Sequence, residues 1–212
     1  MAFNYSIIRS KRKTLSIYVS ADNVIRVRCP NTMSDSEVET FINSKSEWIL
    51  KVLAENSIRR TDNESILNYS ELFIGGNKIP LIFCEKNKID ENAVYVKNVQ
   101  SIKKLLIKCY SAELINYAKQ ISAQVKLSAT DFSIRSYKSR WGCCDRRGAI
   151  TLNYLVVMLP TYLQRYVIIH ELCHTVHFNH SQKFWNLVAK YEPNYKICRK
   201  NLKNFNYLTK IY

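Results

Sequence analysis

His170, Glu171 and His174 form a His-Glu-x-x-His pattern in a segment whose apolar spacing predicts a helix. Two histidines four residues apart project from one helical face, roughly 6 Å apart by Cβ, so both imidazoles can reach one zinc ion. The glutamate between them can face a metal-bound water and act as its general base. All four histidines of the chain lie within residues 170–180. The pattern therefore predicts a zinc site, with Glu171 as the catalytic residue of a hydrolase.

A catalytic zinc usually takes three protein ligands and leaves one position for water. Four residues after the motif can supply the third ligand: His177, His180, Glu192 and Cys198. On an unbroken helix His177 would lie about 10 Å along the axis from the first motif histidine, which is too far. A helix end at residues 178–179 would return His180 toward the metal, because asparagine tolerates a left-handed helix stop. We expect His180 as the third ligand, with Glu192 and His177 as the alternatives.

The elements that must position this motif follow from the spacing of apolar residues. Short apolar and β-branched runs predict strands over residues 5–8, 15–19, 24–29, 72–74, 79–83, 94–96, 132–137 and 149–152. Helical spacing predicts one helix from residue 34 or 35 to about residue 52, one over residues 102–125, the motif helix from residue 160 or 161, and two that begin at Ser181 and Pro193. Gly75-Gly76 predicts a hairpin turn, and Trp141-Gly142 lies in a predicted loop.

Strands and helices are grouped in blocks along the chain, which favours an α+β fold over a doubly wound one. We expect an N-terminal antiparallel β-rich module with one helix over residues 1–98. Residues 99–212 then form a compact catalytic domain. It combines a long backing helix, a small sheet, the motif helix and C-terminal helices.

The composition bounds the class of protein. The chain has 212 residues, of which 47% are hydrophobic, and no run of eighteen apolar residues, so we expect no membrane-spanning helix. The opening six residues lack the basic-then-apolar layout of a secretion signal. The seven cysteines are an odd number, and we interpret them as reduced thiols of a cytoplasmic protein.

The net charge of +15 is large for this length. Residues 173–212 carry seven Lys/Arg and one acid, and residues 131–147 carry five Lys/Arg and two acids. One interpretation is attraction to nucleic acid or to a nucleotide. The other is a well-solvated surface with no partner.

The chain resembles the YgjP-like metallopeptidases, zincin-type proteins related to the SprT and WLM groups. The segments that carry the resemblance are Ser139-Arg140-Trp141-Gly142-Cys143-Cys144, Gly148 to Asn153, Tyr166 to His174, and Asn179-His180-Ser181-x-x-Phe184-Trp185. Arg9-Ser10-x-Arg12-Lys13-Thr14 and the Trp48-Ile49 helix extend the similarity over nearly the whole chain. The resemblance implies a zincin-type catalytic domain with zinc held by His170, His174 and His180 and with Glu171 as base. The family loop more usually has Trp-Gly-Ser-Cys, so Cys143 stands here in place of a serine.

We expect metal-assisted hydrolysis of a peptide or protein substrate. The strand over residues 149–152 can offer an edge to an extended chain, and Asn153 can help to fix the substrate backbone. Tyr195 can donate a hydrogen bond to the developing oxyanion, although a packing role is open for a tyrosine as well.

Two alternatives remain. Some relatives are described as nucleoside-triphosphate (UTP) pyrophosphatases, and Arg135, Lys138 and Arg140 could hold phosphates. A DNA-associated protease is suggested by the likeness to SprT and by the basic C-terminal block. A strict magnesium dependence would favour the first alternative, and steeply salt-dependent DNA binding would favour the second.

Overall fold

The computed structural model describes residues 3–20 and 22–212. Residue contacts divide the chain into two compact units, Met1–Glu64 and Ser65–Tyr212. Both units combine helices with small sheets, which confirms the predicted α+β class. Met1 and Ala2, which belong to the segment used to judge the secretion signal, lie outside the described residues.

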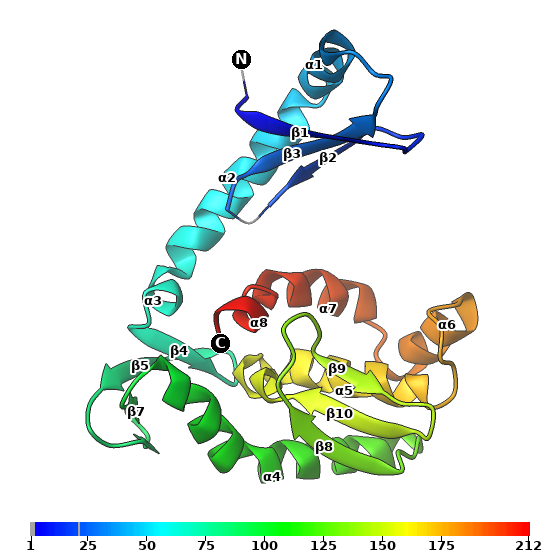
Figure 1. The fold of residues 1–212 in the computed structure, drawn as a ribbon. Coiled ribbons are helices and arrows are strands. Elements are labelled where there is room, and N and C mark those ends of the chain that lie inside the picture. The colour runs from blue at the N-terminus through cyan, green and yellow to red at the C-terminus, as the bar shows by residue number, and fades with distance from the viewer. Residues whose placement is uncertain (1–2, 21) are drawn as a thin grey trace. The chain divides into compact units, whose positions relative to one another are not determined.

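The first unit contains a three-stranded sheet and two helices (Figure 1). Its elements are β1 (Tyr5–Ser10), β2 (Ser16–Val19), β3 (Ile25–Pro30), α1 (Asp35–Ser44) and α2 (Ser46–Asp62). The strand order is β1-β3-β2, with β2 antiparallel to β3 and β1 parallel to it. The sheet is therefore mixed, whereas the sequence predicts an antiparallel module. Apolar alternation locates strands but does not say which strands pair or in which direction.

Strict alternation along β3 separates the two faces of this sheet, because successive strand side chains point to opposite sides. Ile25, Val27 and Cys29 are buried, and Arg26 and Arg28 between them are exposed. The helices complete a small core with the buried residues Val38, Ile42 and Ile49. The first unit thus has one covered sheet face and one that carries arginines.

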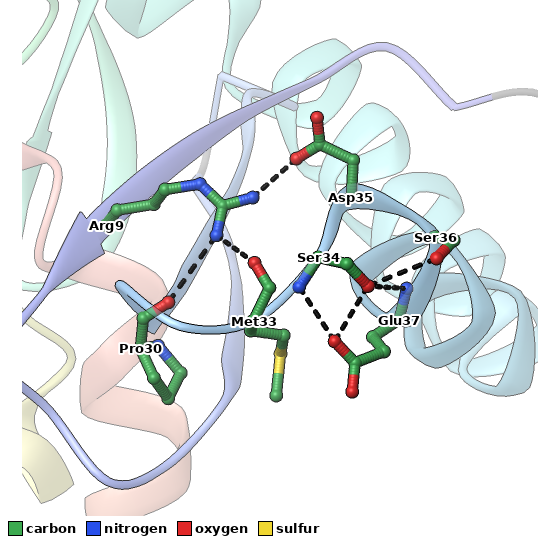
Figure 2. A network of polar contacts seen from close by, with 7 residues as sticks. All are labelled: Arg9, Pro30, Met33, Ser34, Asp35, Ser36 and Glu37. Atoms are coloured by element: carbon green, nitrogen blue, oxygen red, sulfur yellow. Dashed lines mark hydrogen bonds and ion pairs between the residues drawn. The ribbon is translucent and has the colours of Figure 1, made fainter.

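The start of α1 is held by two sets of polar contacts (Figure 2). Ser34 and Glu37 form a capping box, in which the Ser34 hydroxyl accepts from the Glu37 amide and the Glu37 carboxylate accepts from the Ser34 amide. The Ser34 hydroxyl also donates to the Glu37 carboxylate at 2.7 Å, and the pKa of Glu37 is lowered first by this hydrogen bond and then by the one from the Ser34 amide. Arg9 from β1 donates to the carbonyl of Met33 and forms an ion pair with Asp35 at 2.5 Å. These contacts fix the first turn of the helix to the sheet.

The single helix predicted to run to about residue 52 is two helices in the structure. Lys45 ends α1 with non-helical dihedral angles, φ −111° and ψ 12°. The Ser44 hydroxyl donates to the Phe41 carbonyl at 2.7 Å, a local bond that competes with helical backbone pairing. Apolar spacing continues across Lys45, so periodicity alone does not reveal the break.

The second unit begins with a four-stranded sheet of order β4-β5-β7-β6. Its elements are β4 (Glu71–Ile74), β5 (Asn77–Phe83), β6 (Lys88–Ile89) and β7 (Val94–Val96), with the short helix α3 (Glu64–Leu67) at the division between the units. Gly75 and Gly76 form the predicted hairpin turn, with φ of 60° and 86°. Their amides donate to the carbonyls of Val157 and Met158 at 2.8 and 3.1 Å. The tip of the hairpin is therefore attached to the segment that leads into the motif helix.

The rest of the second unit surrounds the motif helix α5 (Thr161–His174). The other elements are α4 (Val99–Val125), β8 (Asp131–Arg135), β9 (Gly142–Cys144), β10 (Ala149–Asn153), the 3-10 turn η1 (Tyr154–Met158), α6 (Gln182–Tyr191), α7 (Tyr195–Leu202), a second 3-10 turn η2 (Lys203–Phe205) and α8 (Leu208–Ile211). α5 packs on β9 and β10 and is also in contact with α4, α6 and α7 (Figure 1). The motif thus lies at the centre of this unit.

The sheet beside α5 has the order β8-β10-β9, with β8 parallel and β9 antiparallel to β10. The prediction that residues 149–152 offer an edge to substrate is wrong, because this strand is paired on both sides. The edge strands of this sheet are β8 and β9, and the sequence predicts the start of β9 as part of a loop. The sequence Gly-Cys-Cys has too few β-branched or aromatic residues to predict a strand, and β9 forms because it pairs with β10.

The two compact units divide between Glu64 and Ser65, earlier in the chain than the predicted boundary at residues 98/99. The four strands from Glu71 to Val96 belong to the same unit as the motif helix. Whether residues 99–212 fold and act alone stays a prediction. Among the described residues, no helix is both long enough and apolar enough to cross a membrane.

Candidate functional site

Burial on nearly every side holds α5 in place. Leu163, Val167, Ile168, Ile169 and Leu172 are all buried, so the helix is enclosed as a central element. Its C-terminal part lines a cavity, through Tyr166 and Val167 and then through the His-Glu-x-x-His residues of its last turn. A packed helix of this kind fixes the direction of its side chains closely.

The structure brings His170, His174 and His180 together. The ring centroids of His170 and His174 are 4.9 Å apart. The ring centroid of His180 lies 5.1 Å from that of His170 and 4.8 Å from that of His174. One ring nitrogen from each residue lies within 4.8 Å of the others, and Nε2 of His170 is 3.1 Å from Nε2 of His180. Within the described ranges, no other His, Cys, Asp or Glu joins this cluster.

A sharp return of the chain after α5 positions His180. The helix ends at His174, four residues before the predicted stop, and Thr175 caps it with its hydroxyl donating to the Leu172 carbonyl at 2.7 Å. The next helix starts at the predicted cap, because the Ser181 hydroxyl accepts from the Phe184 amide. The loop between the two helices is therefore short enough to bring the third histidine back beside the first two.

Hydrogen bonding and stacking orient the imidazoles. Nδ1 of His174 lies 2.9 Å from the carbonyl oxygen of His177, so Nδ1 carries the proton and Nε2 presents a lone pair. Phe184 stacks on His174 at 4.4 Å between ring centroids, and Trp185 stacks on His180 at 5.5 Å. Both aromatic residues come from α6, so α6 packs against two of the three histidines.

The arrangement fits a zinc ion. Two nitrogens bound to zinc at about 2.0–2.1 Å in a tetrahedral site lie roughly 3.3 Å apart, close to the observed 3.1 Å between Nε2 of His170 and Nε2 of His180. Nδ1 of His170 is buried and has no hydrogen-bond partner among the described residues. Three imidazoles are a donor set that suits zinc and other borderline metals rather than magnesium.

Burial also favours the uncharged form of two of the imidazoles, those of His170 and His174. The pKa of His170 is lowered to about 3, first by burial and then by the nearby His174 and His180. The pKa of His174 is also lowered, mainly by burial. Both rings are therefore neutral at physiological pH, as a metal ligand must be.

Glu171 lies beside the cluster and is only 7% exposed. Burial raises the pKa of its carboxyl group to about 8, and the nearby Arg140 guanidinium opposes this shift. Gly142 of β9 lies directly against this side chain. A Cβ at that position would be 2.8 Å from Cγ of Glu171 and 3.0 Å from Cδ and Oε1. Glycine is therefore required here for the carboxylate to occupy its observed place.

A cavity of about 510 Å³ opens over these residues. The three histidines and Glu171 line it together with the following residues: Ser139, Arg140, Trp141, Gly142, Cys143, Cys144, Tyr166, Val167, Phe178 and Leu202. The whole edge strand β9 thus forms part of its wall. Within the described part of the chain, Glu171 is the only acidic residue among those that line it.

The predicted substrate-binding residues occupy three different positions. Arg140 lines the cavity and lies over the Tyr137 ring, 5.8 Å from its centroid. Asn153 is fully buried, and its amide donates to the carbonyls of Tyr137 and Arg140 at 2.9 Å each. Its side-chain oxygen accepts from the Leu155 amide at 3.2 Å. Asn153 therefore holds the loop that carries Arg140.

The third of these residues, Tyr195, stacks on Trp185 with 5.4 Å between ring centroids, one layer behind His180. The alternative ligand Glu192 forms an ion pair with Arg165 at 3.7 Å and is not part of the histidine cluster. Cys198 is buried within α7, outside the cluster.

Sequence reasoning missed three contributors to the site. Gly142 and Cys144 lie next to Glu171, and the pKa of the Cys144 thiol is raised to about 11 by burial and by that carboxylate. Both belong to the Trp-Gly-x-Cys segment, but the strand that they form is not visible in its composition. The His177 contribution is a backbone carbonyl, which side-chain patterns cannot reveal.

Comparison with known proteins bears on this site. The family described as "YgjP-like, metallopeptidase domain" matches residues 13–205. A solved structure described as that of the metallopeptidase zymogen of Pyrococcus abyssi abylysin is 28% identical, with a TM-score of 0.36. The match covers 43% of this chain and 90% of that one. A search of curated proteins found no match.

The family match spans most of the chain, including the histidine cluster, Glu171 and β9. Its description as a metallopeptidase domain agrees with a cavity that is lined by three convergent imidazoles and one buried carboxyl group. The chain therefore belongs to the YgjP-like metallopeptidase family.

Proposed function

We propose that the chain is a zinc-dependent peptidase, with zinc held by His170, His174 and His180 and with Glu171 as general base. One observation carries this proposal: three imidazole nitrogens converge within 4.8 Å of one another beside a buried carboxyl group, at the wall of one cavity. When bound, zinc lowers the pKa of water to roughly 7 and polarises a carbonyl group.

We assign the proton transfers of the reaction to Glu171. Its carboxylate accepts a proton from the attacking water and then delivers that proton to the leaving amine nitrogen. Gly142 leaves room for the carboxylate, and the surrounding apolar packing excludes water that would compete for its proton. Burial disfavours the ionised form of Glu171, which is the form that acts as base, and the guanidinium of Arg140 opposes this effect.

The edge position of β9 supports a peptide or protein substrate. An extended chain can pair with this edge through its backbone and reach over the histidine cluster. The edge residues Gly142, Cys143 and Cys144 all line the cavity. We therefore assign substrate alignment to β9, in place of the strand over residues 149–152.

Arg140 is the side chain that we assign to an anionic group of the substrate. Among the described residues it forms no ion pair, and it is one of the residues that line the cavity. Asn153 positions the Arg140 backbone and is not itself exposed to substrate. Tyr195 supports Trp185, so we assign it to the packing behind His180 and not to the oxyanion.

The alternative of UTP hydrolysis finds less support in this cavity. Enzymes that act on nucleoside triphosphates hold magnesium with carboxylates, and Glu171 is the only acid lining the described cavity wall. The predicted DNA association has no support from the family match. A cytoplasmic location is proposed on the seven unpaired cysteines, which a reducing compartment keeps as thiols.

The test is the Glu171→Gln variant, with Glu192→Gln as the matched control. Both proteins are expected to retain stoichiometric zinc by inductively coupled plasma mass spectrometry. Only Glu171→Gln should lose all cleavage sites in a proteomic screen against wild type, because only it removes the base. Turnover that persists in Glu171→Gln would refute the general-base role. Loss of zinc from Glu192→Gln would revive Glu192 as a ligand, and strict magnesium dependence would favour phosphate chemistry.

A further inference from the structure

The proposed peptidase site uses no residue of the first unit. The exposed face of the three-stranded sheet in that unit carries arginines. The register places Arg26 of β3 between Ser6 of β1 and Tyr18 of β2. Two residues further along, Arg28 lies between Ile8 and Ser16 by the same register. Paired residues share a face, so these side chains form one surface, which we call the arginine face.

Both arginines of the arginine face are exposed, and neither forms an ion pair with a described residue. Lys11 and Lys13, in the loop that follows β1, are also exposed and unpaired within the described ranges. Arg9 differs from them, since its charge is already matched by Asp35 (Figure 2). The arginine face therefore presents positive charge that the protein itself does not neutralise.

Charge is segregated between the two halves of this unit. Residues 3–33, which form the sheet, carry six Lys/Arg and one acid. Residues 34–64, which form the helices, carry four Lys/Arg and seven acids. A chain whose basic residues served solubility alone would have no reason to separate the signs in this way.

The arginine face also carries exposed groups that are not charged. Tyr18 is 55% exposed and Ile8 is 42% exposed, at opposite sides of the two arginines. The hydroxyl groups of Ser6, Ser10 and Ser16 make no hydrogen bond with the described residues. An aromatic ring, two guanidinium groups and three hydroxyls thus lie on one face of the sheet.

We propose that the arginine face binds single-stranded RNA. The two guanidiniums and the adjacent lysines neutralise phosphates, and the Tyr18 ring provides a stacking surface for an unpaired base. Serine hydroxyls are suited to the ribose 2′-hydroxyl, the group by which a protein distinguishes RNA from DNA. The open face of a small sheet is a surface on which unstacked bases can spread.

The shape of the surface argues against two other partners. A peptide that adds to a sheet as a further strand uses the unpaired backbone groups at the strand edges, whereas the charged side chains here lie on the face. A duplex offers grooves that accept a helix or a two-stranded ribbon, and it keeps its bases stacked away from an exposed ring. Single-stranded RNA uses the charge, the aromatic ring and the hydroxyls together.

The experiment measures fluorescence anisotropy of a labelled, unstructured 12-nucleotide RNA titrated with the full-length protein. Arg26→Glu/Arg28→Glu should weaken binding at least tenfold at 50 mM NaCl. The matched control Lys51→Glu/Arg60→Glu makes the same charge change on α2 and should stay within about twofold of wild type. The slope of log K against log salt is negative, and the milder Arg26→Gln/Arg28→Gln variant should reduce its magnitude by roughly 1.4. This corresponds to about 0.7 for each phosphate that the variant no longer neutralises.

Tyr18→Ala should weaken binding roughly fivefold or more while leaving the salt slope unchanged, because stacking is not ionic. All substituted side chains are exposed, and circular dichroism checks that each variant is folded. Absence of RNA binding, equal losses in the α2 control, or equal affinity for DNA or duplex of the same sequence would each overturn the proposal. The assay needs no turnover, so its outcome is separate from that of the peptidase assignment.

Discussion

Substituting Gly142 by alanine tests how closely β9 controls the base. The added Cβ would lie 2.8 Å from Cγ of Glu171, where ordinary contacts are 3.4–4 Å. The carboxylate must therefore retreat by about 0.6–1.2 Å. A misplacement of about 1 Å at a reacting group costs roughly 100-fold in rate, which corresponds to about 2.7 kcal/mol of activation free energy. We expect kcat/KM to fall about 100-fold while the bound zinc stays stoichiometric.

The assay pairs initial rates on a fluorescent unfolded protein with zinc content and thermal melting. Gly142→Ala is expected to lower the free energy of unfolding by about 1–3 kcal/mol, because it overpacks a filled space. Gly148→Ala is the control: it strains a positive φ of 81° in the β9–β10 turn, but its nearest neighbour is Thr130 at 3.7 Å. It should lose stability and keep its kcat/KM. If Gly142→Ala keeps wild-type kcat/KM, or loses zinc together with activity, the positioning argument is wrong.

Three further predictions concern the surroundings of the site. His177→Ala should retain zinc and activity, because the contact made by residue 177 is a backbone carbonyl, whereas His180→Ala should lose zinc after dialysis. Asn153→Ala breaks three buried hydrogen bonds and should lower the free energy of unfolding by about 2–4 kcal/mol. Calorimetry should then show a melting temperature roughly 5–15 °C lower. Since burial raises the pKa of Cys144 to about 11, only about one thiol in 1,000 is ionised at pH 8. Its alkylation by iodoacetamide, followed by peptide mapping, should therefore accelerate about tenfold per pH unit up to that value.

The histidine cluster could be predicted from sequence because helical geometry dictates it. Residues four apart share a face of any helix, so His170 and His174 converge whatever surrounds them. His180 follows from the need for a third ligand, although the helix stops at His174 and not at residues 178–179. The sequence does not reveal this stop, because the residue at the C-cap is Thr175, neither the glycine nor the asparagine that commonly marks a helix end.

The parts that could not be predicted depend on pairing between distant segments. The edge strand β9 is set by its register with β10, and the parallel β1–β3 pair has no local signature. The contact of Gly142 with Glu171 joins residues that lie far apart in the chain, so no local pattern contains it. Asn153 at a strand end suggests a role toward substrate, but burial turns its amide inward to the loop before β9.

The hairpin at Gly75-Gly76 has a practical consequence for anyone who seeks a minimal version of this enzyme. Its two amides hold the segment that precedes α5, and a Cβ on Gly76 would be 2.6 Å from Cγ of Pro160, just before the start of that helix. A fragment that begins at residue 99 lacks this brace and leaves the Val157 carbonyl without its donor. A shortened protein should therefore begin no later than Ser65, so that it keeps the anchor of the helix that carries the His-Glu-x-x-His residues.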